Sequence, residues 1–184
     1  KMYQEKAKSI VNETKAKQLL VALDKTFQKN EMLGAPRKAL IFTESRRTQE
    51  YLKNFLQNNG YNGKVVCFNG SNNDEDSKSI YRKWLSLYAG SKRISGRTII
   101  DRKQSLVDYF RTDAEIMIAT ESGAEGINLQ FCSLLVNYDM PWNPQRIEQR
   151  IGRCHRYGQK FDVVVVNFVN QLNYADCRVY ELLN

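Results

Sequence analysis

Five short apolar runs follow one another along the chain, at residues 38–42, 64–68, 115–119, 134–138 and 162–169. Most positions within each run are apolar, whereas a half-exposed strand would alternate apolar and polar residues. Such runs are typical of parallel strands that helices cover on both faces. Because helical patterns or long connections separate the runs, we predict an α/β fold with a parallel sheet between helical layers.

The first 37 residues follow a helical pattern instead. Between residues 3 and 30, apolar side chains recur at helical spacing among lysines and glutamines, and a Gly-Ala-Pro segment at 34–36 ends the pattern. The recurring positions are Ile10, Leu19, Leu20, Leu23 and Phe27. We therefore expect an N-terminal helical lead-in over residues 1–37, of one or two amphipathic helices, docked on a domain of residues 38–184.

The connection after the first apolar run reads as one helix. Ser45 is placed to cap its start, and Gly60 is placed to end it. Its buried stripe would consist of Tyr51, Leu52, Phe55 and Leu56.

The connection between the second and third runs, residues 69–114, is longer than a single crossover helix requires. It contains helical patterns around residues 80–88 and 99–110, joined by a linker at 90–98. We predict that residues 70–112 contain a basic helical insertion.

Composition and charge point to a soluble domain with a polyanionic partner. The chain has 184 residues, of which 42% are hydrophobic, and a net charge of +8. Residues 1–38 hold nine basic and four acidic side chains, residues 77–112 nine and two, and residues 145–160 five and one. An excess of basic over acidic side chains can also serve to keep a protein soluble. Positive charge that is concentrated in a few segments, however, is expected where a surface faces phosphate.

Other partners are excluded or disfavoured. No apolar run approaches the length that spans a bilayer, and the first residues lack the apolar core of a signal peptide. The sequence has four cysteines that lie far apart, no CxxC pair and a single histidine. We therefore predict no metal site. We expect a protein with no membrane partner that resides in the cytoplasm, or in the nucleus of a eukaryote.

The strongest chemical signal is the segment 149–156, Gln-Arg-Ile-Gly-Arg-Cys-His-Arg. Its three arginines are spaced by three residues, so helical geometry predicts guanidinium groups along one face and its exit turn, with Gly152 permitting close approach. A solvated basic helix would show the same spacing. The segment follows a predicted strand near Asp139, however, and α/β sheets bind ligands at the carboxyl ends of their strands, so we predict a phosphate-binding site.

This segment resembles motif VI of superfamily-two helicases, and the chain from about residue 38 onward resembles their second RecA-like lobe. Residues 118–129, Ile-Ala-Thr-Glu-Ser-Gly-Ala-Glu-Gly-Ile-Asn-Leu, resemble motif V, and residues 41–47, Ile-Phe-Thr-Glu-Ser-Arg-Arg, resemble motif IV. Within the superfamily, the Trp-Asn-Pro at 142–144, the His-Arg-Tyr-Gly-Gln at 155–159 and the segment 176–183 are most similar to Swi/Snf-like translocases. The expected fold is thus RecA-like.

The resemblance implies a site for the cofactor ATP. Arg153 and Arg156 match the catalytic arginine fingers, which stabilise the charge on the γ-phosphate during transfer. The residues expected to bind the nucleotide are Gln149, Gly126, Asn128 and Gly152. Elsewhere in the superfamily an aspartate can stand at the position of Asn128, where an asparagine still donates and accepts hydrogen bonds.

The resemblance also implies contacts to nucleic acid. Small donors and arginine forks suit the tracking of a phosphate backbone without reading bases. The residues expected from the matched motifs are Arg46, Asn69, Gly70 and Thr120. The insertion departs from the family, and its basic and aromatic residues separately suggest a grip on duplex backbone through Arg93, Arg97 and Arg102. Ser45, Asn69 and Thr120 have purely structural alternatives, and the insertion could be a solvated excursion or could dock a protein partner. Trp142 is expected to pack between prolines and the sheet, and His155 to be a packed or hydrogen-bonded structural residue.

The sequence lacks the nucleotide-binding motifs that a complete helicase motor requires. It contains no Gly-x-x-x-x-Gly-Lys-Ser/Thr loop and no Walker B acidic pair, so the chain alone is expected not to hydrolyse ATP. The resemblance implies a first RecA-like lobe in the same polypeptide that holds ATP and Mg²⁺, this chain being an excised part.

The most specific interpretation is the C-terminal motor lobe of an ATP-dependent translocase on double-stranded DNA. Two alternatives stay open: a lobe of a strand-separating RNA or DNA helicase, and a non-catalytic nucleic-acid-binding or scaffolding module. Intact arginines at 153 and 156 argue against a non-catalytic module.

Overall fold

The computed structural model describes residues 2–169, with side chains described from residue 13 onward. Its centre is a five-stranded sheet in the order β2-β3-β1-β4-β5, in which all neighbouring strands are parallel. The strands are β1 (Ala39–Thr43), β2 (Val65–Phe68), β3 (Ile116–Thr120), β4 (Leu134–Asn137) and β5 (Val164–Asn167). Each lies within one of the five apolar runs or one residue beyond it, which confirms the predicted parallel sheet.

Successive residues of the central strands enter two separate cores. In β1, Ile41 stands beside Ile118 of β3 and Val136 of β4, and all three belong to one apolar cluster. Leu40 and Phe42 belong to the cluster on the opposite face. Burial on both faces explains why these strands read as continuous apolar runs.

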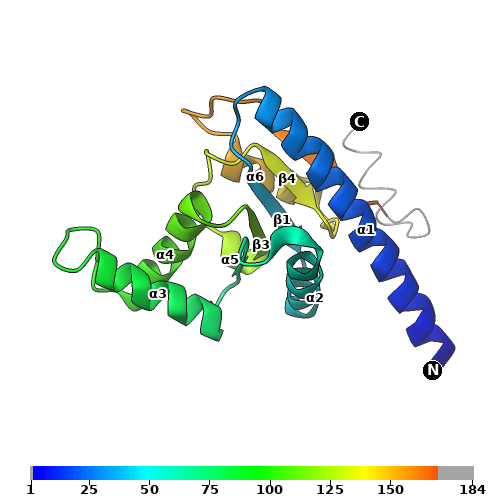
Figure 1. Ribbon diagram of the computed structural model, residues 1–184, viewed down its shortest axis with the longest axis horizontal. Helices are drawn as coiled ribbons and strands as arrows, with labels where there is room; N and C mark the ends of the chain where they lie inside the picture. Colours follow the sequence, from blue (N-terminus) through cyan, green and yellow to red (C-terminus); the bar gives the residue numbers. More distant parts are fainter. Residues whose placement is uncertain (1, 170–184) are drawn as a thin grey trace.

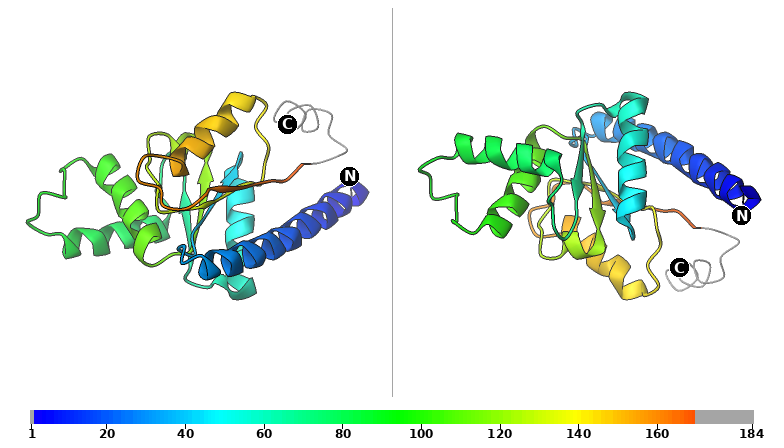
Figure 2. Two further views of the ribbon diagram at one scale, coloured as in Figure 1. Left: turned by 90° about the horizontal axis from the view of Figure 1, so that it is seen from above. Right: turned by 90° about the horizontal axis from the view of Figure 1, so that it is seen from below.

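The first face is covered by α1 (Met2–Met32) and α2 (Arg46–Leu56), as Figure 2 shows. The predicted lead-in is one continuous helix, and its Leu19, Leu23 and Phe27 are fully buried in the cluster that contains Ile41. Docking of the lead-in on the sheet is therefore confirmed. Gly34, with a φ of +70°, follows the helix and turns the chain toward β1.

Helix α2 begins as predicted, but the set of side chains that it buries against the sheet differs from the predicted one. The Ser45 hydroxyl accepts a hydrogen bond from the Thr48 amide, which caps the helix. Tyr51 is exposed, so its predicted burial was wrong. It stacks on Phe55, which is partly buried against the core, whereas buried Gln49 donates to the carbonyl oxygens of Phe68 and Ile118. A π-helical turn, η1 (Gln57–Tyr61), connects α2 to β2.

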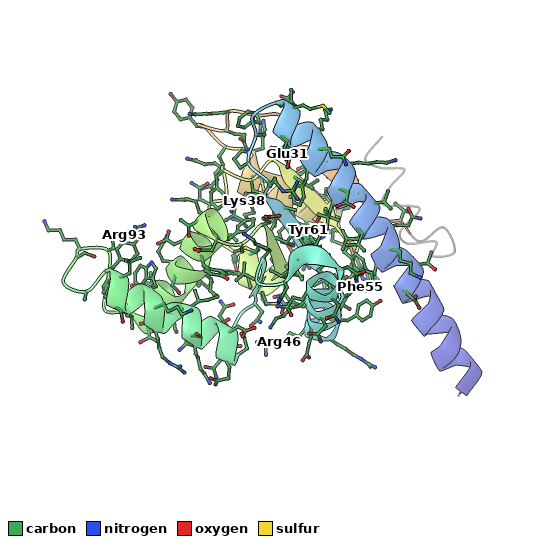
Figure 3. All side chains as sticks on the ribbon, viewed as in Figure 1. Glu31, Lys38, Arg46, Phe55, Tyr61 and Arg93 are labelled. Atoms are coloured by element: carbon green, nitrogen blue, oxygen red, sulfur yellow. The ribbon has the colours of Figure 1, made fainter. Side chains whose placement is uncertain are left out.

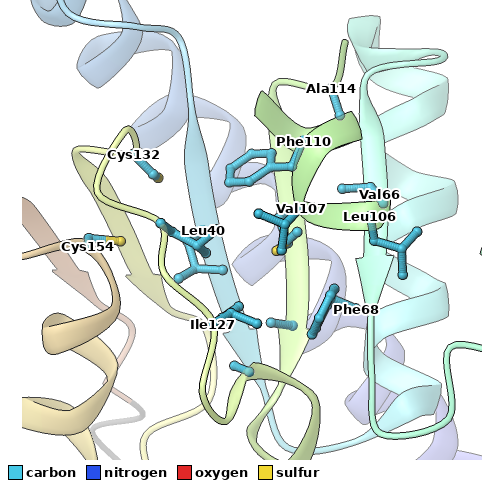
Figure 4. Close-up of a cluster of buried hydrophobic side chains, with 14 of the residues drawn as sticks. Leu40, Val66, Phe68, Leu106, Val107, Phe110, Ala114, Ile127, Cys132 and Cys154 are labelled. Carbon is cyan, nitrogen blue, oxygen red and sulfur yellow. The ribbon is translucent and has the colours of Figure 1, made fainter. Parts of the chain in front are cut away.

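The second face is covered by α4 (Thr98–Thr112), the short α5 (Glu121–Ala124) and α6 (Pro144–Cys154). Figure 4 shows this core, in which Leu106, Val107 and Phe110 of α4 meet Leu40 and Phe68 of the sheet. Cys154 of α6 is buried in the same cluster.

The predicted insertion forms a hairpin of α3 (Glu75–Leu87) and α4 that projects from one side of the sheet (Figure 1). Buried Asp108 of α4 holds it together, because its carboxylate accepts from Trp84 Nε1 at 2.8 Å, from Gln104 Nε2 at 2.9 Å and from Arg93 Nη2 at 3.1 Å. The linker 90–98 lies at the outer end of the hairpin.

Candidate functional site

The carboxyl ends of the parallel strands share one edge of the sheet, where α/β folds bind ligands. Thr43 ends β1 shortly before Arg46, Phe68 ends β2 directly before Asn69 and Gly70, and Thr120 is the last residue of β3. The register pairs Thr43 with Thr120, so the motif IV and motif V segments leave the sheet side by side. The topology thus brings four of the predicted nucleic-acid residues to one edge.

Arg150 is an internal cross-link rather than an exposed phosphate ligand. Its side chain is 2% exposed, and its Nε and Nη2 both donate to Glu121 Oε2, at 2.9 and 2.6 Å. Its Nη1 donates to Asn137 Oδ1 and to the Asp139 carbonyl, at 2.8 and 3.0 Å. The guanidinium also lies over the Phe42 ring, 4.7 Å from its centroid. Arg150 therefore does not offer a free guanidinium to phosphate, in contrast to what the spacing of the three arginines indicated.

Arg153 and Arg156 differ from Arg150 in their surroundings. Arg153 is half-buried and Arg156 is exposed, and neither guanidinium has a hydrogen-bond or ion-pair partner within residues 13–169. Their charge is thus not neutralised by contacts in the described part of the chain. A guanidinium in that condition is available to bind phosphate oxygens.

A hollow of about 420 Å³ lies between α5 and α6 and brings Arg153 together with Gln149. Its other lining residues are Phe42, Glu121, Ser122, Ala124, Glu125, Arg146 and Arg150. Exposed Arg146 was not among the predicted residues, although its spacing from Gln149 and Arg153 places it on the same helical face. The hollow therefore presents Arg146 and Arg153 beside buried Arg150.

Gly126 and Asn128 line a neighbouring hollow of about 440 Å³, between α4 and the 125–128 segment. Glu125 borders both hollows. Gly152 lines neither of them, and a Cβ built there would meet no atom within 4 Å among the described residues. Gln149 thus lies in one hollow and Gly126 and Asn128 in the other, with Glu125 between them, whereas Gly152 lines neither.

Arg46 and Asn69 are brought into contact, since Arg46 Nη2 donates to Asn69 Oδ1 at 3.0 Å. The same Asn69 oxygen accepts the amides of Ser71 and Asn72, and Asn69 Nδ2 donates to Gln49 Oε1 at 3.2 Å. Asn69 is buried and its side chain organises the turn after β2. Arg46 and the rim of this turn line a further hollow of about 410 Å³.

Helix α5 lies directly against that turn. A Cβ at Gly70 would be 3.2 Å from Ser122 Oγ, and a Cβ at Gly123 would be 2.6 Å from Asn69 Cα. The Thr120 hydroxyl oxygen is buried without a hydrogen-bond partner among the described residues. Segments that leave β2 and β3 are thus packed against each other at the edge where nucleic acid was predicted to bind.

The three insertion arginines occupy different places. Figure 3 shows Arg93 at the outer end of the hairpin, away from Arg46, and its guanidinium lies 4.3 Å from the Tyr88 ring centroid as well as against Asp108. Arg97 is exposed in the same linker. Arg102 instead joins α4 to the turn after β2, because its Nη1 donates to the Asn72 carbonyl at 3.3 Å and to Asn73 Oδ1 at 3.2 Å.

Two predictions for single residues were wrong. Trp142 is 85% exposed in the segment before α6, so it does not pack between the prolines and the sheet. Asn143, beside it, caps α6 by accepting the Gln145 amide, and this cap holds the segment without Trp142. His155 is also exposed, because α6 ends at Cys154 and the buried position at that end is taken by Cys154.

Two cysteine thiols, half-buried Cys67 and buried Cys154, have raised pKa values. Burial raises the pKa of Cys67 to about 12, and a hydrogen bond with Cys132, together with burial, raises the pKa of Cys154. Among residues 13–169 no group of three His, Cys, Asp or Glu side chains is arranged to hold a metal ion. No helix described in the structure is long and apolar enough to cross a membrane.

Comparison with known families and proteins places this geometry in context. Residues 14–158 match the model of the helicase conserved C-terminal domain. The chain is 44% identical over 134 residues to the uncharacterized ATP-dependent helicase YqhH of Bacillus subtilis, a match that covers 73% of this chain and 19% of that protein. It is 32% identical over 155 residues to Helicase swr-1 of Neurospora crassa, covering 83% of this chain and 7% of that protein.

Solved structures share the fold. The C-terminal part of the Fun30 ATPase domain matches with a TM-score of 0.62 and 22% identity, over 91% of this chain and 44% of that one. The Escherichia coli DEAD-box protein SrmB matches with a TM-score of 0.59 and 19% identity, over 94% of this chain and 80% of that one. The chain spans about a fifth of the length of YqhH and less than a tenth of that of swr-1.

Proposed function

The chain belongs to the helicase conserved C-terminal domain family, and from this premise we propose that it is the second RecA-like lobe of an ATP-dependent translocase on double-stranded DNA. The observation that supports this proposal most strongly is the contrast within the arginine segment. Arg150 is buried and saturated with partners, whereas Arg153 reaches the α5–α6 hollow with no partner in the described chain.

The proposed catalytic residues are Arg153 and Arg156, acting as arginine fingers on ATP. ATP supplies the phosphoryl group whose transfer to water releases the free energy for movement. Charge spreads over the γ-phosphate oxygens in the transition state, and an arginine from a neighbouring lobe accelerates this step by about 10³ to 10⁵. The hollow has a positive balance suited to such an anion, because its lining holds three arginines, Arg146, Arg150 and Arg153, against the two glutamates Glu121 and Glu125. In this proposal Gln149, Gly152, Gly126 and Asn128 border the nucleotide.

A first RecA-like lobe in the same, longer polypeptide would hold ATP and its Mg²⁺. The sequence of this chain contains no phosphate-binding loop and no Walker B acids, so its residues can complete such a site but not form it. The relatives YqhH and swr-1 are several times longer than the matched region, which leaves room for that lobe in proteins of this kind. Closure of two lobes on ATP would bring Arg153 and Arg156 to the phosphates.

The nucleic-acid surface is proposed at the carboxyl edge of the sheet and along the hairpin. Arg46, Gly70 and Thr120 supply a guanidinium, an exposed backbone and a buried hydroxyl without a described partner at that edge. These groups suit phosphate oxygens rather than base edges. Arg93 and Arg97 extend the positive surface to the hairpin tip, while Arg102 and Asn69 shape the turn that joins the two parts.

The proposal is tested by ATP turnover and displacement assays on the longer polypeptide. We expect duplex DNA to stimulate turnover more than single-stranded DNA or RNA does, and the enzyme to displace a third strand from a triplex without separating the duplex. Separation of strands in the presence of ATP would instead assign the lobe to an unwinding helicase. Absence of stimulated turnover with every nucleic acid would contradict the proposal.

A further inference from the structure

The hollow between α4 and the 125–128 segment has the size and the walls of a small-molecule site. Its volume is about 440 Å³, and its apolar wall consists of Ile100, Val107 and Ile127. Val107 and Ile127 belong to the core that Figure 4 shows, whereas Ile100 is 48% exposed. Sites of about 300–1,000 Å³ with apolar walls and a few polar groups are typical of small ligands.

Gln104 of α4 brings an amide to this hollow, and Asp108 fixes the orientation of that amide. Gln104 Nε2 donates to Asp108 Oδ1 at 2.9 Å. Asp108 also accepts from Trp84 and Arg93, so its carboxylate is an acceptor and must face the amide nitrogen rather than the amide oxygen. Gln104 Oε1 therefore faces away from Asp108, and it has no hydrogen-bond partner in the described part of the chain. A ligand in the hollow meets an acceptor that is held in place.

This hollow adjoins the α5–α6 hollow in which Arg153 lies. Glu125 borders both hollows. Gly126, with a φ of +79°, turns the chain directly after it, and Asn128 lines the α4 side. A nucleotide with its phosphates at Arg153 and its ribose at Gly126 and Asn128 would therefore extend its base toward α4.

We infer that the α4 hollow takes the adenine base of ATP, and that Gln104 Oε1 selects adenine by accepting its 6-amino group. This inference rests on the proposed function. Adenine carries a donor where guanine carries the O6 acceptor, so a fixed acceptor attracts the first base and repels the second.

The charge of the lining agrees with this occupant. Lys103 and Arg111 stand against the single acidic residue Glu125, a positive balance that disfavours a cation and suits the neutral base of an anionic ligand. Base selection would then come from the insertion, which is the part of the sequence that departs from the family.

The test measures nucleotide binding to the longer polypeptide by calorimetry, with duplex DNA and Mg²⁺ present and with the β,γ-imido analogues of ATP and GTP. Gln104→Met keeps the length of the side chain but removes the acceptor, and Gln104 is exposed, so this variant is expected to fold. We expect the ratio of the GTP-analogue Kd to the ATP-analogue Kd to fall roughly tenfold. An analogue whose purine lacks the 6-amino group should bind the variant and the unmodified polypeptide with Kd values within about twofold.

Trp84→Phe is the matched control, because it removes another donor to Asp108 but does not line this hollow. It should change the Kd ratio by less than about twofold. An unchanged ratio in Gln104→Met, with or without a loss of DNA affinity, or an equal fall in both variants would overturn the inference. Failure of the proposed function looks different, because then the unmodified polypeptide shows no DNA-stimulated ATP turnover or Arg153→Ala retains turnover.

Discussion

Gly123 lies against the backbone of Asn69 with no room for a side chain, since a Cβ on Gly123 would come within 2.6 Å of the Asn69 Cα. This contact joins the short helix after β3 to the turn after β2. Two segments that are far apart in the sequence thus form one surface at the carboxyl edge of the sheet. The proposed nucleic-acid site depends on this close approach.

Gly123→Ala should therefore destabilise the chain by about 1–3 kcal/mol, the usual cost of forcing an atom into a packed site. Urea unfolding of the chain measures this. Gly152→Ala is the matched control, because Gly152 lies inside α6 and a Cβ there meets no described atom within 4 Å. The control should be neutral or stabilise by up to about 1 kcal/mol, as alanine does in a helix. Equal unfolding midpoints for both variants would contradict the packing described.

Asp108 should be essential to the insertion hairpin. Asp108→Ala removes the acceptor of buried Trp84 Nε1 and of Gln104 and Arg93, which leaves a buried donor unpaired. We expect a loss of about 1–3 kcal/mol in the free energy of unfolding. Asp162→Ala, at an exposed loop position, should change it by less than about 0.5 kcal/mol. A loss at Asp108 no larger than at Asp162 would show that the hairpin does not depend on this carboxylate.

Charge reversal at the hairpin tip tests its proposed contact with DNA. Arg97→Glu should weaken duplex binding by the chain and lower the magnitude of the log–log salt slope by roughly 1. Fluorescence anisotropy at several salt concentrations measures both. Lys25→Glu reverses an exposed charge on α1, on the face of the sheet opposite α4, and serves as the control. Identical affinities and slopes for the two variants would exclude the tip from the DNA surface.

The Cys67 thiol should be protected from alkylation because its raised pKa suppresses ionisation, in addition to its partial burial. Its pKa is raised to about 12 by burial, against the opposing effect of the Lys53 ammonium. The thiolate is the nucleophile, and an unperturbed cysteine has a pKa near 8.5, so labelling at pH 9 should be roughly 10² to 10³ slower in the folded than in the unfolded chain. Folded-state labelling should continue to rise from pH 9 to 11, whereas unfolded-state labelling levels off.

Mass spectrometry of the Cys67 peptide follows this reaction. A plateau near pH 9 in the folded chain would show an unperturbed thiol.

The sheet could be predicted from the sequence because its determinants are local. Strands buried on both faces must be apolar at nearly every position, and the five runs reflect that requirement directly. The Ser45 hydroxyl likewise bonds to Thr48, only three residues away, so its capping role could be inferred from spacing. Tyr51 was misplaced because Gln49, a polar residue, takes the inner position by bonding to strands far along the chain.

The site was only partly predictable, since burial of a charge depends on distant partners. Arg150 and Arg153 look equivalent in the sequence, but the partners that bury Arg150 include Glu121, which is 29 residues away. Asn69 could be placed at the sheet edge but not recognised as an internal hydrogen-bond centre. The late Asp-Cys-Arg-Val-Tyr-Glu-Leu-Leu segment at 176–183, which contributed to the resemblance, lies outside the described residues.

The central claim is that Arg153 completes an ATP site formed on another lobe, and ATP turnover by the longer polypeptide with Arg153→Ala tests it most directly. Turnover in saturating duplex DNA should fall by about 10³ to 10⁵, while binding of a labelled ATP analogue persists. Arg156→Ala should likewise lose turnover, and Lys25→Ala, at an exposed position on α1, should not. Turnover of Arg153→Ala within a few fold of the unmodified enzyme would contradict the claim.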